Sequence, residues 1–333
     1  MTRSFKLQRR AAIARGVLAG AALLAGGACF AQAGAYPSKP VRLVVGFAAG
    51  GPTDVVARAF ADHASRALGQ PFIIENKPGA STIVAAQAVA SAPADGYTLL
   101  FNGSIHTMLP ALYGDRLKFD AVRSFLPLCT VSTSPTVLVV GPALGVGTLG
   151  QYLAKVRAAP GQVSVGSPGV GSTGHFASEM FARLNGVRLN HIPYKGAAPV
   201  INDVIGGQLD SSFATLGSVL PQVQAGKLSV LAVASPKRST LLPDVPTFAQ
   251  AGGGDFLADA WYGLLAVAGT PASVVQTLER VATDFARSDA TVARLRGLGL
   301  EAESTCGKAF ADLVQRDVAT YARLARELDI KAD

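Results

Sequence analysis

A glycine-rich turn at residues 46–54, Gly-Phe-Ala-Ala-Gly-Gly-Pro-Thr-Asp, is the segment whose residue types point most directly to a chemistry. It follows the apolar run 41–45 and opens a helical pattern at Thr53, with Pro52 placed where a first-turn proline is tolerated. Such a turn leaves backbone N–H groups unpaired at the positive end of the helix dipole, an arrangement that binds anions. Because the turn contains no Lys, no Arg and no Walker residues, it predicts a small carboxylate rather than a polyphosphate.

The order of strand, glycine turn, helix and strand occurs a second time. Residues 163–167 form a predicted strand, residues 168–174 are Pro-Gly-Val-Gly-Ser-Thr-Gly, and a helical pattern then leads to a strand at Leu189. Two domains that each present such a helix start predict a cleft with one anion-binding wall on either side, at the carboxyl ends of the strands. Ordinary α/β regularity is the alternative explanation of the repeat.

Known enzyme motifs are matched only in part. Residues 169–174 fit G-x-G-x-x-G, but the dinucleotide fingerprint also needs an acid about 20 residues later, and no Asp or Glu occurs between Glu179 and Asp203. The serines at 167 and 172 lack the glycine that a nucleophile elbow requires two residues earlier. We therefore predict no cofactor, no catalytic residue and no enzymatic activity.

The sequence allows two interpretations of the role of several titratable residues. The histidines show no metal-ligand spacing, so no metal site is predicted from His63, His106, His175 and His191. His106, two residues after Ser104 at the end of a predicted strand, and His175 in the second turn's helix either line the cleft or make structural hydrogen bonds. Asp54 either satisfies free N–H groups at the helix start, or orders waters or contacts a ligand ammonium. Tyr194 ends a strand on the side of the 168–174 turn.

Residues 1–35 are predicted to be a cleaved signal peptide. An apolar stretch at 17–28 is followed by the small-x-small pattern Ala31-Gln32-Ala33. A signal anchor is the alternative, and the export route stays open. Five of the eight net positive charges lie in this segment, at Arg3, Lys6, Arg9, Arg10 and Arg15. The remaining net charge of +3 comes with no basic stripe interleaved with aromatic residues, which argues against nucleic acid as a partner.

Two cysteines remain after the predicted cleavage, Cys129 and Cys306, and they lie 177 residues apart. In an oxidising compartment they could pair, but we expect two buried, unpaired cysteines.

Short apolar runs alternate with helical segments along residues 36–333, a pattern typical of α/β units on a mainly parallel sheet. The predicted strands are 41–46, 72–75, 97–101, 126–131, 137–140, 163–167, 189–193, 211–214, 229–234 and 262–267. Predicted helices include 53–68, 81–90, 174–184 and 198–205, and the tail 271–328 is predicted to be helical with a break near 297–307.

Motifs along nearly all of residues 36–333 resemble the Bug family, the substrate-binding proteins of tripartite tricarboxylate transporters. They comprise Tyr-Pro-Ser-Lys-Pro at 36–40, the turn at 49–54, Glu-Asn-Lys-Pro-Gly-Ala at 75–80, Asp-Gly-Tyr-Thr-Leu at 95–99, His-Ile-Pro-Tyr-Lys-Gly-Ala-Ala-Pro at 191–199, Pro-Asp-Val-Pro-Thr at 243–247 and Trp-Tyr-Gly at 261–263. Each motif is weak alone, but their order and spacing are specific.

The resemblance implies a two-lobed periplasmic binding protein of type II, which closes on its ligand like a Venus flytrap. Residues 36–134 with 259–333 would form lobe 1, and residues 135–258 lobe 2. The implied function is capture of a small organic acid and delivery to integral-membrane transporter subunits, by a monomer in the periplasm. A ligand-sensing subunit that passes its closed form to a receptor, or a periplasmic enzyme on the same scaffold, are the alternatives.

The resemblance also assigns the ligand-binding residues by motif position. The first wall is Phe47, Ala49, Gly50, Gly51, Thr53 and Asp54. The second wall is Ser167, Gly171, Ser172 and Thr173, with Tyr194 near by. Ser104 lies at the end of the third strand, and its neighbour His106 is the further candidate named above.

Overall fold

A computed structural model describes residues 36–256 and 258–331, so the predicted signal peptide lies outside the described residues. Residues from Lys39 onward form one compact unit. Within the described residues, no helix combines the length and the apolar character needed to cross a membrane.

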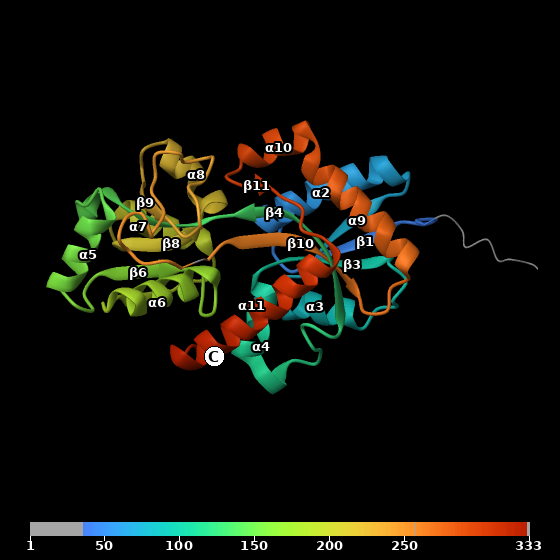
Figure 1. The fold of residues 1–333 in the computed structure, drawn as a ribbon, viewed down its shortest axis with the longest axis horizontal. Helices are drawn as coiled ribbons and strands as arrows, with labels where there is room; N and C mark the ends of the chain where they lie inside the picture. The colour runs from blue at the N-terminus through green and yellow to red at the C-terminus, as the bar shows by residue number, and fades with distance from the viewer. Residues whose placement is uncertain (1–35, 257, 332–333) are drawn as a thin grey trace, which may run out of the picture. The chain divides into compact units, whose positions relative to one another are not determined.

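Six strands form the sheet of the first lobe, in the order β11-β4-β10-β3-β1-β2 (Figure 1). The strands are β1 (Val41–Val45), β2 (Phe72–Asn76), β3 (Thr98–Gly103), β4 (Phe125–Ser134), β10 (Ala260–Val267) and β11 (Glu301–Ala302). β1 pairs in parallel with β2 and β3, whereas β10 runs antiparallel to β3 and β4.

Five strands form the sheet of the second lobe, in the order β7-β6-β8-β5-β9. They are β5 (Thr136–Val140), β6 (Ser164–Ser167), β7 (Asn190–Pro193), β8 (Ser211–Thr215) and β9 (Ser229–Val233). β6 is parallel to β7 and β8, and β5 is antiparallel to β8 and β9.

Both sheets are therefore mixed rather than mainly parallel, and the chain path explains the difference. Only Pro135 separates β4 in one sheet from β5 in the other, and β10 returns the chain to the first sheet. A strand that arrives directly from the other sheet is not the second strand of a βαβ unit, so it is free to insert antiparallel. The two-lobed α/β fold class is confirmed. The lobe boundaries at 134/135 and 258/259 stay a prediction.

Ten α-helices are described: α2 (Pro52–Leu68), α3 (Ile83–Ala90), α4 (Ile105–Tyr113), α5 (Leu149–Ala158), α6 (Thr173–Asn185), α7 (Ala197–Gly206), α8 (Leu216–Gln224), α9 (Ala272–Arg287), α10 (Asp289–Arg296) and α11 (Gly307–Glu327). Helix α2 illustrates how the sequence sets an element. Pro52 stands at its first position, Val56 and Phe60 are buried four residues apart, and Gly69 ends it in the left-handed conformation, with φ of 69°.

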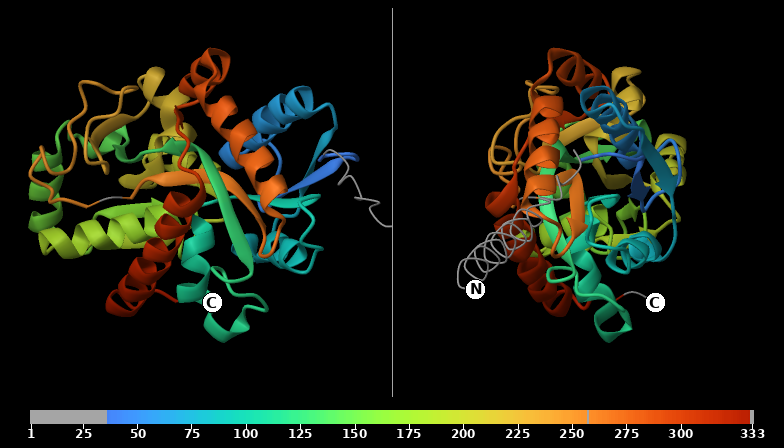
Figure 2. Two further views of the ribbon diagram at one scale, coloured as in Figure 1. Left: turned by 45° about the vertical axis from the view of Figure 1, so that its right-hand side comes forward. Right: turned by 90° about the vertical axis from the view of Figure 1, so that its right-hand side faces the viewer.

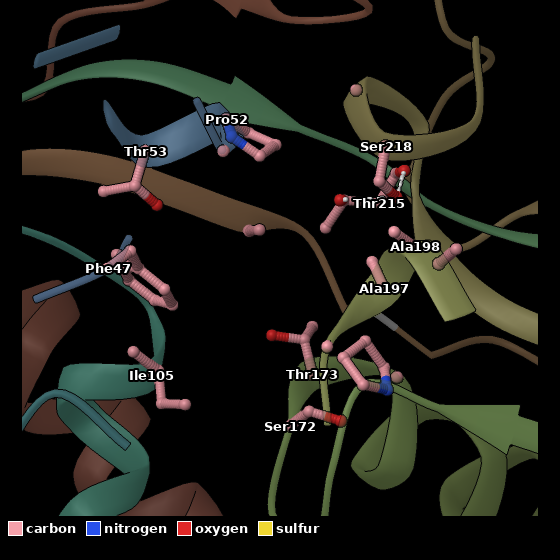
Figure 3. A pocket seen from close by; sticks show the side chains of 18 of the residues that line it. Phe47, Pro52, Thr53, Ile105, Ser172, Thr173, Ala197, Ala198, Thr215 and Ser218 are labelled. Carbon is pink, nitrogen blue, oxygen red and sulfur yellow. Dashed lines mark hydrogen bonds between the residues drawn. The ribbon is translucent and has the colours of Figure 1, made fainter. Parts of the chain in front are cut away.

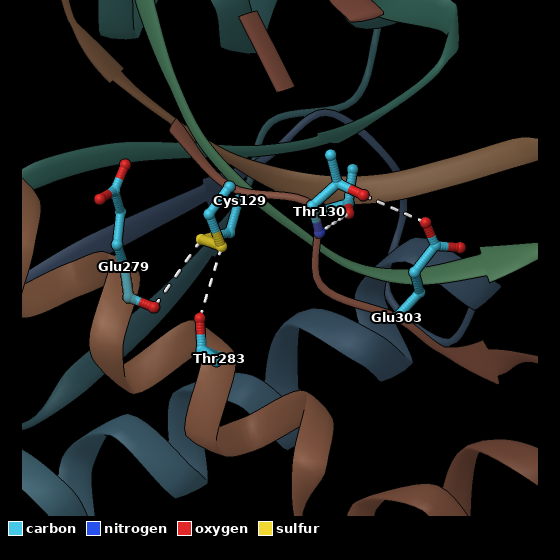
Figure 4. The surroundings of a disulfide bond; sticks show 7 residues. Cys129, Thr130, Glu279, Thr283 and Glu303 are labelled. Atoms are coloured by element: carbon cyan, nitrogen blue, oxygen red, sulfur yellow. Dashed lines mark hydrogen bonds between the residues drawn. A yellow bond between two sulfur atoms is a disulfide. The ribbon is translucent and has the colours of Figure 1, made fainter. Parts of the chain in front are cut away.

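The expectation of unpaired cysteines is wrong, because Cys129 and Cys306 form a disulfide (Figure 4). An antiparallel bridge joins the backbone of the same two residues, and beside it the Thr130 N–H donates to the Thr305 carbonyl oxygen at 2.9 Å. The segment that precedes α11 thus adds to the edge of β4 and brings the two sulfurs together. A separation of 177 residues conceals such pairing in the sequence.

Helix α11 extends from the first lobe toward the second. Figure 2 shows it beside α4, and Leu324 of α11, Leu112 of α4 and Phe176 of α6 belong to one apolar cluster. The rings of Phe176 and Tyr321 meet edge to face with centroids 4.9 Å apart. This cluster packs elements of both lobes together.

Candidate ligand-binding cleft

A cleft of about 840 Å³ lies between the two lobes, at the carboxyl ends of the parallel strands. Figure 3 shows Phe47, Thr53 and Ile105 of the first lobe facing Thr173 and other side chains of the second lobe across it. Its described lining includes one cationic side chain, that of Lys195, and no carboxylate, histidine or cysteine. Apolar side chains make up much of the rest of the wall.

Five helices direct their N-termini at this cleft. The residue that caps each of helices α2, α4, α6, α7 and α8 is part of the lining, namely Gly51, Ser104, Ser172, Gly196 and Thr215. Only Ser172 of these makes a side-chain capping hydrogen bond, which it accepts from the His175 N–H. First-turn N–H groups have no partner within their own helix, so the helix ends give the cleft a positive potential.

The first glycine turn is held from behind by Asp54, whose side chain is not part of the cleft lining. Its Oδ2 accepts hydrogen bonds from the Gly50 N–H at 2.9 Å and from Arg58 Nε at 2.8 Å, and its Oδ1 accepts from Asn76 Nδ2 at 2.8 Å. Burial acts to raise the pKa of Asp54, but these hydrogen bonds and the Arg58 charge outweigh it and hold the pKa below its ordinary value. Asp54 is therefore ionised and fully engaged.

The second glycine turn is held against both lobes. Gly171 has φ of 72°, which favours glycine. A Cβ added there would lie 2.3 Å from Cδ1 of Leu112 in the first lobe. Gly174 admits no side chain either, because its Cβ would lie 2.2 Å from the Phe213 carbonyl oxygen. The glycines thus allow the turn and the start of α6 to approach their neighbours closely.

Eight of the predicted ligand-binding residues line the cleft: Phe47, Ala49, Gly50, Gly51, Thr53, Ser104, Ser172 and Thr173. The other five are not among the lining residues: Asp54, His106, Ser167, Gly171 and Tyr194. The structure thus brings residues of both predicted walls to one cleft. Their contact with a ligand stays a prediction.

His106 and Tyr194 form hydrogen bonds with groups that are not part of the cleft lining. The His106 side chain is fully buried, its Nε2 lies 2.8 Å from the Ala121 carbonyl oxygen, and burial lowers its pKa to about 4. The Tyr194 hydroxyl donates to Asp203 Oδ2 at 2.5 Å, and this hydrogen bond raises the pKa of Tyr194 to about 12. Of the two readings for His106, the hydrogen bond is the one observed.

Sequence reasoning missed part of the second-lobe wall. Lys195, Ala197, Ala198, Thr215 and Ser218 line the cleft at the starts of α7 and α8. Thr215 directly follows a strand that was predicted, so the rule that ligands bind at the carboxyl ends of strands would have found it. The start of α7 follows β7 in the same way, but only Gly196 marks it.

Comparison with known proteins shows the family of this chain. The family model described as tripartite tricarboxylate transporter family receptor matches residues 56–330. The chain belongs to this family. Among relatives, Protein BugT of Bordetella pertussis is 32% identical over 308 residues, which cover 92% of this chain and 94% of BugT. The resemblance to the Bug family is therefore confirmed.

Two similar solved structures contain small acids. An R. palustris protein solved with adipate is 32% identical and has a TM-score of 0.80. The match covers 89% of this chain and 100% of that protein. MatC from Rhodopseudomonas palustris, solved with bound malate, is 29% identical with a TM-score of 0.76, over 87% of this chain and 99% of MatC. Adipate and malate are both carboxylates.

Proposed function

We propose that this protein captures a small organic acid in the cleft between its lobes and delivers it to integral-membrane transporter subunits. The observation that carries the proposal is the convergence of five helix N-termini, from both lobes, on a cleft whose only charged lining side chain among the described residues is Lys195. Oriented backbone N–H groups suit a carboxylate. The adipate and malate bound by two relatives support the same ligand class.

The interactions available are sufficient for reversible capture. A carboxylate at a helix N-terminus gains about 0.3–1 kcal/mol when exposed and up to about 2 kcal/mol when partly buried. Hydrogen bonds to a charged group contribute about 1.5–3 kcal/mol each. A few such contacts from two walls amount to about −8 kcal/mol, which corresponds to a micromolar Kd. Because neither wall alone supplies them all, the ligand favours the closed arrangement of the lobes.

We propose no catalytic role. The described lining offers hydroxyl groups and one lysine, but no histidine, carboxylate or thiol positioned to accept a proton from a bound acid. We further propose export to the periplasm through the predicted signal peptide, and action as a monomer. Incubation of the protein with any acid that it binds should leave that acid chemically unchanged by mass spectrometry.

Isothermal titration calorimetry tests the proposal with a panel of acids that includes adipate and malate. Gly51→Val is the informative variant, because Gly51 has φ of −76° and nothing closer than 3.8 Å to an added Cβ, so the fold tolerates it. The new side chain stands at the N-terminus of α2, in the cleft lining. Gly147→Val is the matched control, at an open glycine outside the lining.

We expect at least one acid to bind the wild-type protein with a micromolar Kd, Gly51→Val to weaken it at least tenfold, and Gly147→Val to leave it unchanged. Mass spectrometry of denatured protein should also reveal the acid that copurifies. A wild-type protein that binds no member of the panel and copurifies with no acid contradicts the proposal.

A further inference from the structure

A stacked pair of histidines lies directly behind the second glycine turn. His175 is in α6 and His191 is in β7, and their rings are parallel within 3° with centroids 3.9 Å apart. Both contact turn residues that are not part of the cleft lining, Gly171 and Ser167. The residues next to these two, Pro168, Val170 and Ser172, line the cleft.

The hydrogen bond to Gly171 assigns the proton of His175. The Gly171 N–H donates to His175 Nδ1 at 3.0 Å. A ring nitrogen that accepts a hydrogen bond carries no proton, so neutral His175 holds its proton on Nε2. That nitrogen lies 4.0 Å from Glu179 Oε1.

The hydrogen bonds of Ser167 assign the proton of His191. The Ser167 hydroxyl donates its single hydrogen to the Gly169 carbonyl oxygen at 3.1 Å. Both contacts are satisfied together only if His191 Nε2 is the donor in its 2.7 Å bond to the same hydroxyl, so we assign the proton of His191 to Nε2. A chain of two hydrogen bonds then runs from His191 through Ser167 to the backbone of the turn.

We infer that His175 and His191 are positioning residues, which as a pair of neutral Nε2–H imidazoles fix the backbone of the second glycine turn where it lines the cleft. His175 acts as an acceptor that fixes the Gly171 amide, and His191 acts as a donor that fixes Ser167 and, through it, Gly169. The inference rests on the proposed function for its consequence in binding, but not for the hydrogen-bond pattern itself.

The surroundings keep both rings neutral. Burial lowers the pKa of His175 to about 3, with a smaller contribution from the neighbouring His191, and burial lowers the pKa of His191 to about 4. The Glu179 carboxyl group lies near the pair, and burial raises its pKa. A proton on His175 Nδ1 would face the Gly171 N–H and break the bond.

Metal binding is the competing reading of this cluster. One ligand atom from each of His175, Glu179 and His191 lies within 4.8 Å of the other two. However, both Nε2 atoms carry protons in the network above, and His175 Nδ1 is occupied by the Gly171 N–H. A divalent cation would have to displace the contacts that hold the turn, so we assign the cluster to positioning. The absence of a metal site stays a prediction.

Substitution by the two amides separates this inference from simple packing. The Asn side-chain oxygen lies near the place of His Nδ1, and the Gln side-chain nitrogen lies near the place of His Nε2. His175→Asn should therefore retain the acceptor and His175→Gln should lose it. At position 191 the order reverses, because His191→Gln retains the donor and His191→Asn loses it.

Two measurements apply to all four variants. The first needs no ligand, since hydrogen–deuterium exchange reports the protection of the amides of residues 169–174. We expect exchange at least about tenfold faster in His175→Gln and His191→Asn than in the wild type, and within threefold of it in the two retaining variants. The second is calorimetry with adipate and malate, in which Kd should follow the same order. Long-range ¹H–¹⁵N spectra of the wild type should report Nε2–H tautomers for both rings.

Each outcome decides one of the two claims. Equal exchange in Asn and Gln variants at either position, or a proton on His175 Nδ1, overturns the positioning inference whatever the protein binds. Acid binding by the wild type without the reciprocal pattern leaves the proposed function standing and rejects the positioning residues. The reciprocal pattern in exchange, with no acid bound by the wild type, supports the positioning of the turn and rejects the proposed function.

Discussion

Replacement of Asp54 by asparagine tests how the first glycine turn is held. The Asp54 side chain is 1% exposed, and its oxygens accept hydrogen bonds from Gly50, Arg58 and Asn76. Asparagine has the same shape, but an NH₂ group, which cannot accept a hydrogen bond, replaces one of the two carboxylate oxygens. Asn76 cannot compensate by turning its amide, because its Nδ2 also donates to the Phe47 carbonyl oxygen.

The expected decrease in the free energy of unfolding follows from the hydrogen bonds that Asp54→Asn removes. If the new NH₂ group faces Asn76, one hydrogen bond is lost and the ionic character of the Arg58 contact goes with it. If it faces Gly50, two bonds are lost. Hydrogen bonds to a charged group contribute about 1.5–3 kcal/mol each, whereas the Arg58 side chain is 48% exposed and adds little as an ion pair. Asp54→Asn should therefore lower the free energy of unfolding by about 2–4 kcal/mol.

Acid titration adds a second readout. The pKa of Asp54 is below its ordinary value in the folded protein, so its contribution to stability is present above the unfolded pKa of about 4 and is lost as the pH falls through the folded value. Asp54→Asn removes this contribution at every pH. The difference in stability between wild type and variant should therefore be constant from pH 8 to pH 5 and shrink below about pH 4.

Chemical denaturation and calorimetry with adipate and malate measure the two effects. Asp62→Asn is the matched control, because Asp62 lies in the same helix and is exposed, and we expect it to change stability by less than about 0.5 kcal/mol. Asp54→Asn should also weaken acid binding about tenfold or more, since the Gly50 amide loses its anchor. An Asp54→Asn protein that unfolds and binds like Asp62→Asn would refute this account of the turn.

Three further predictions concern charge, the disulfide and pH. Lys195→Met should raise the Kd for acids about threefold to fivefold at low salt, and calorimetry at high ionic strength should show a smaller difference. Changing both Cys129 and Cys306 to alanine should lower the free energy of unfolding by about 3–5 kcal/mol, because the bond closes a loop of 177 residues; reduced wild-type protein should match the variant in denaturant titrations. Burial raises the pKa of Asp259 to about 6 despite a hydrogen bond from Ser235, so stability should fall as the pH rises from about 4 to 6. Asp259→Asn should then be about 1–3 kcal/mol more stable than wild type at pH 8 and no more stable at pH 4.

The secondary structure followed from local patterns, whereas the sheet arrangement did not. All ten predicted strands occur, with ends shifted by a few residues at most, because apolar runs between turn residues are a local property. The two-residue strand β11 was missed because it is too short to show a pattern. The antiparallel insertion of β5 and β10 depends on the crossing between lobes, which periodicity does not encode.

The cleft was predictable where backbone conformation marks it in the sequence. Gly50, with φ of 90°, and Gly171, with φ of 72°, need glycine, so both turns were found from composition. The directions of side chains were not predictable. Asp54, His106 and Tyr194 are each next in sequence to a lining residue, yet their side chains form hydrogen bonds with groups outside the lining. The pairing of Cys129 with Cys306 likewise depends on a backbone bridge between distant segments.

The first glycine turn is held by an ionised group and the second by neutral groups. Both groups keep these states over a common range of pH, in which we expect binding. The first requires an ionised carboxylate, Asp54, whose pKa lies below its ordinary value. The second involves neutral rings of His175 and His191, whose pKa values are about 3 and 4. Both groups therefore keep the required protonation state above about pH 4. A carboxylic acid with an ordinary pKa near 4 is ionised over the same range, so acidification removes the charge of the ligand and the anchors of both turns together. Acid affinity should consequently fall more steeply below pH 4 than the ionisation of the ligand alone predicts.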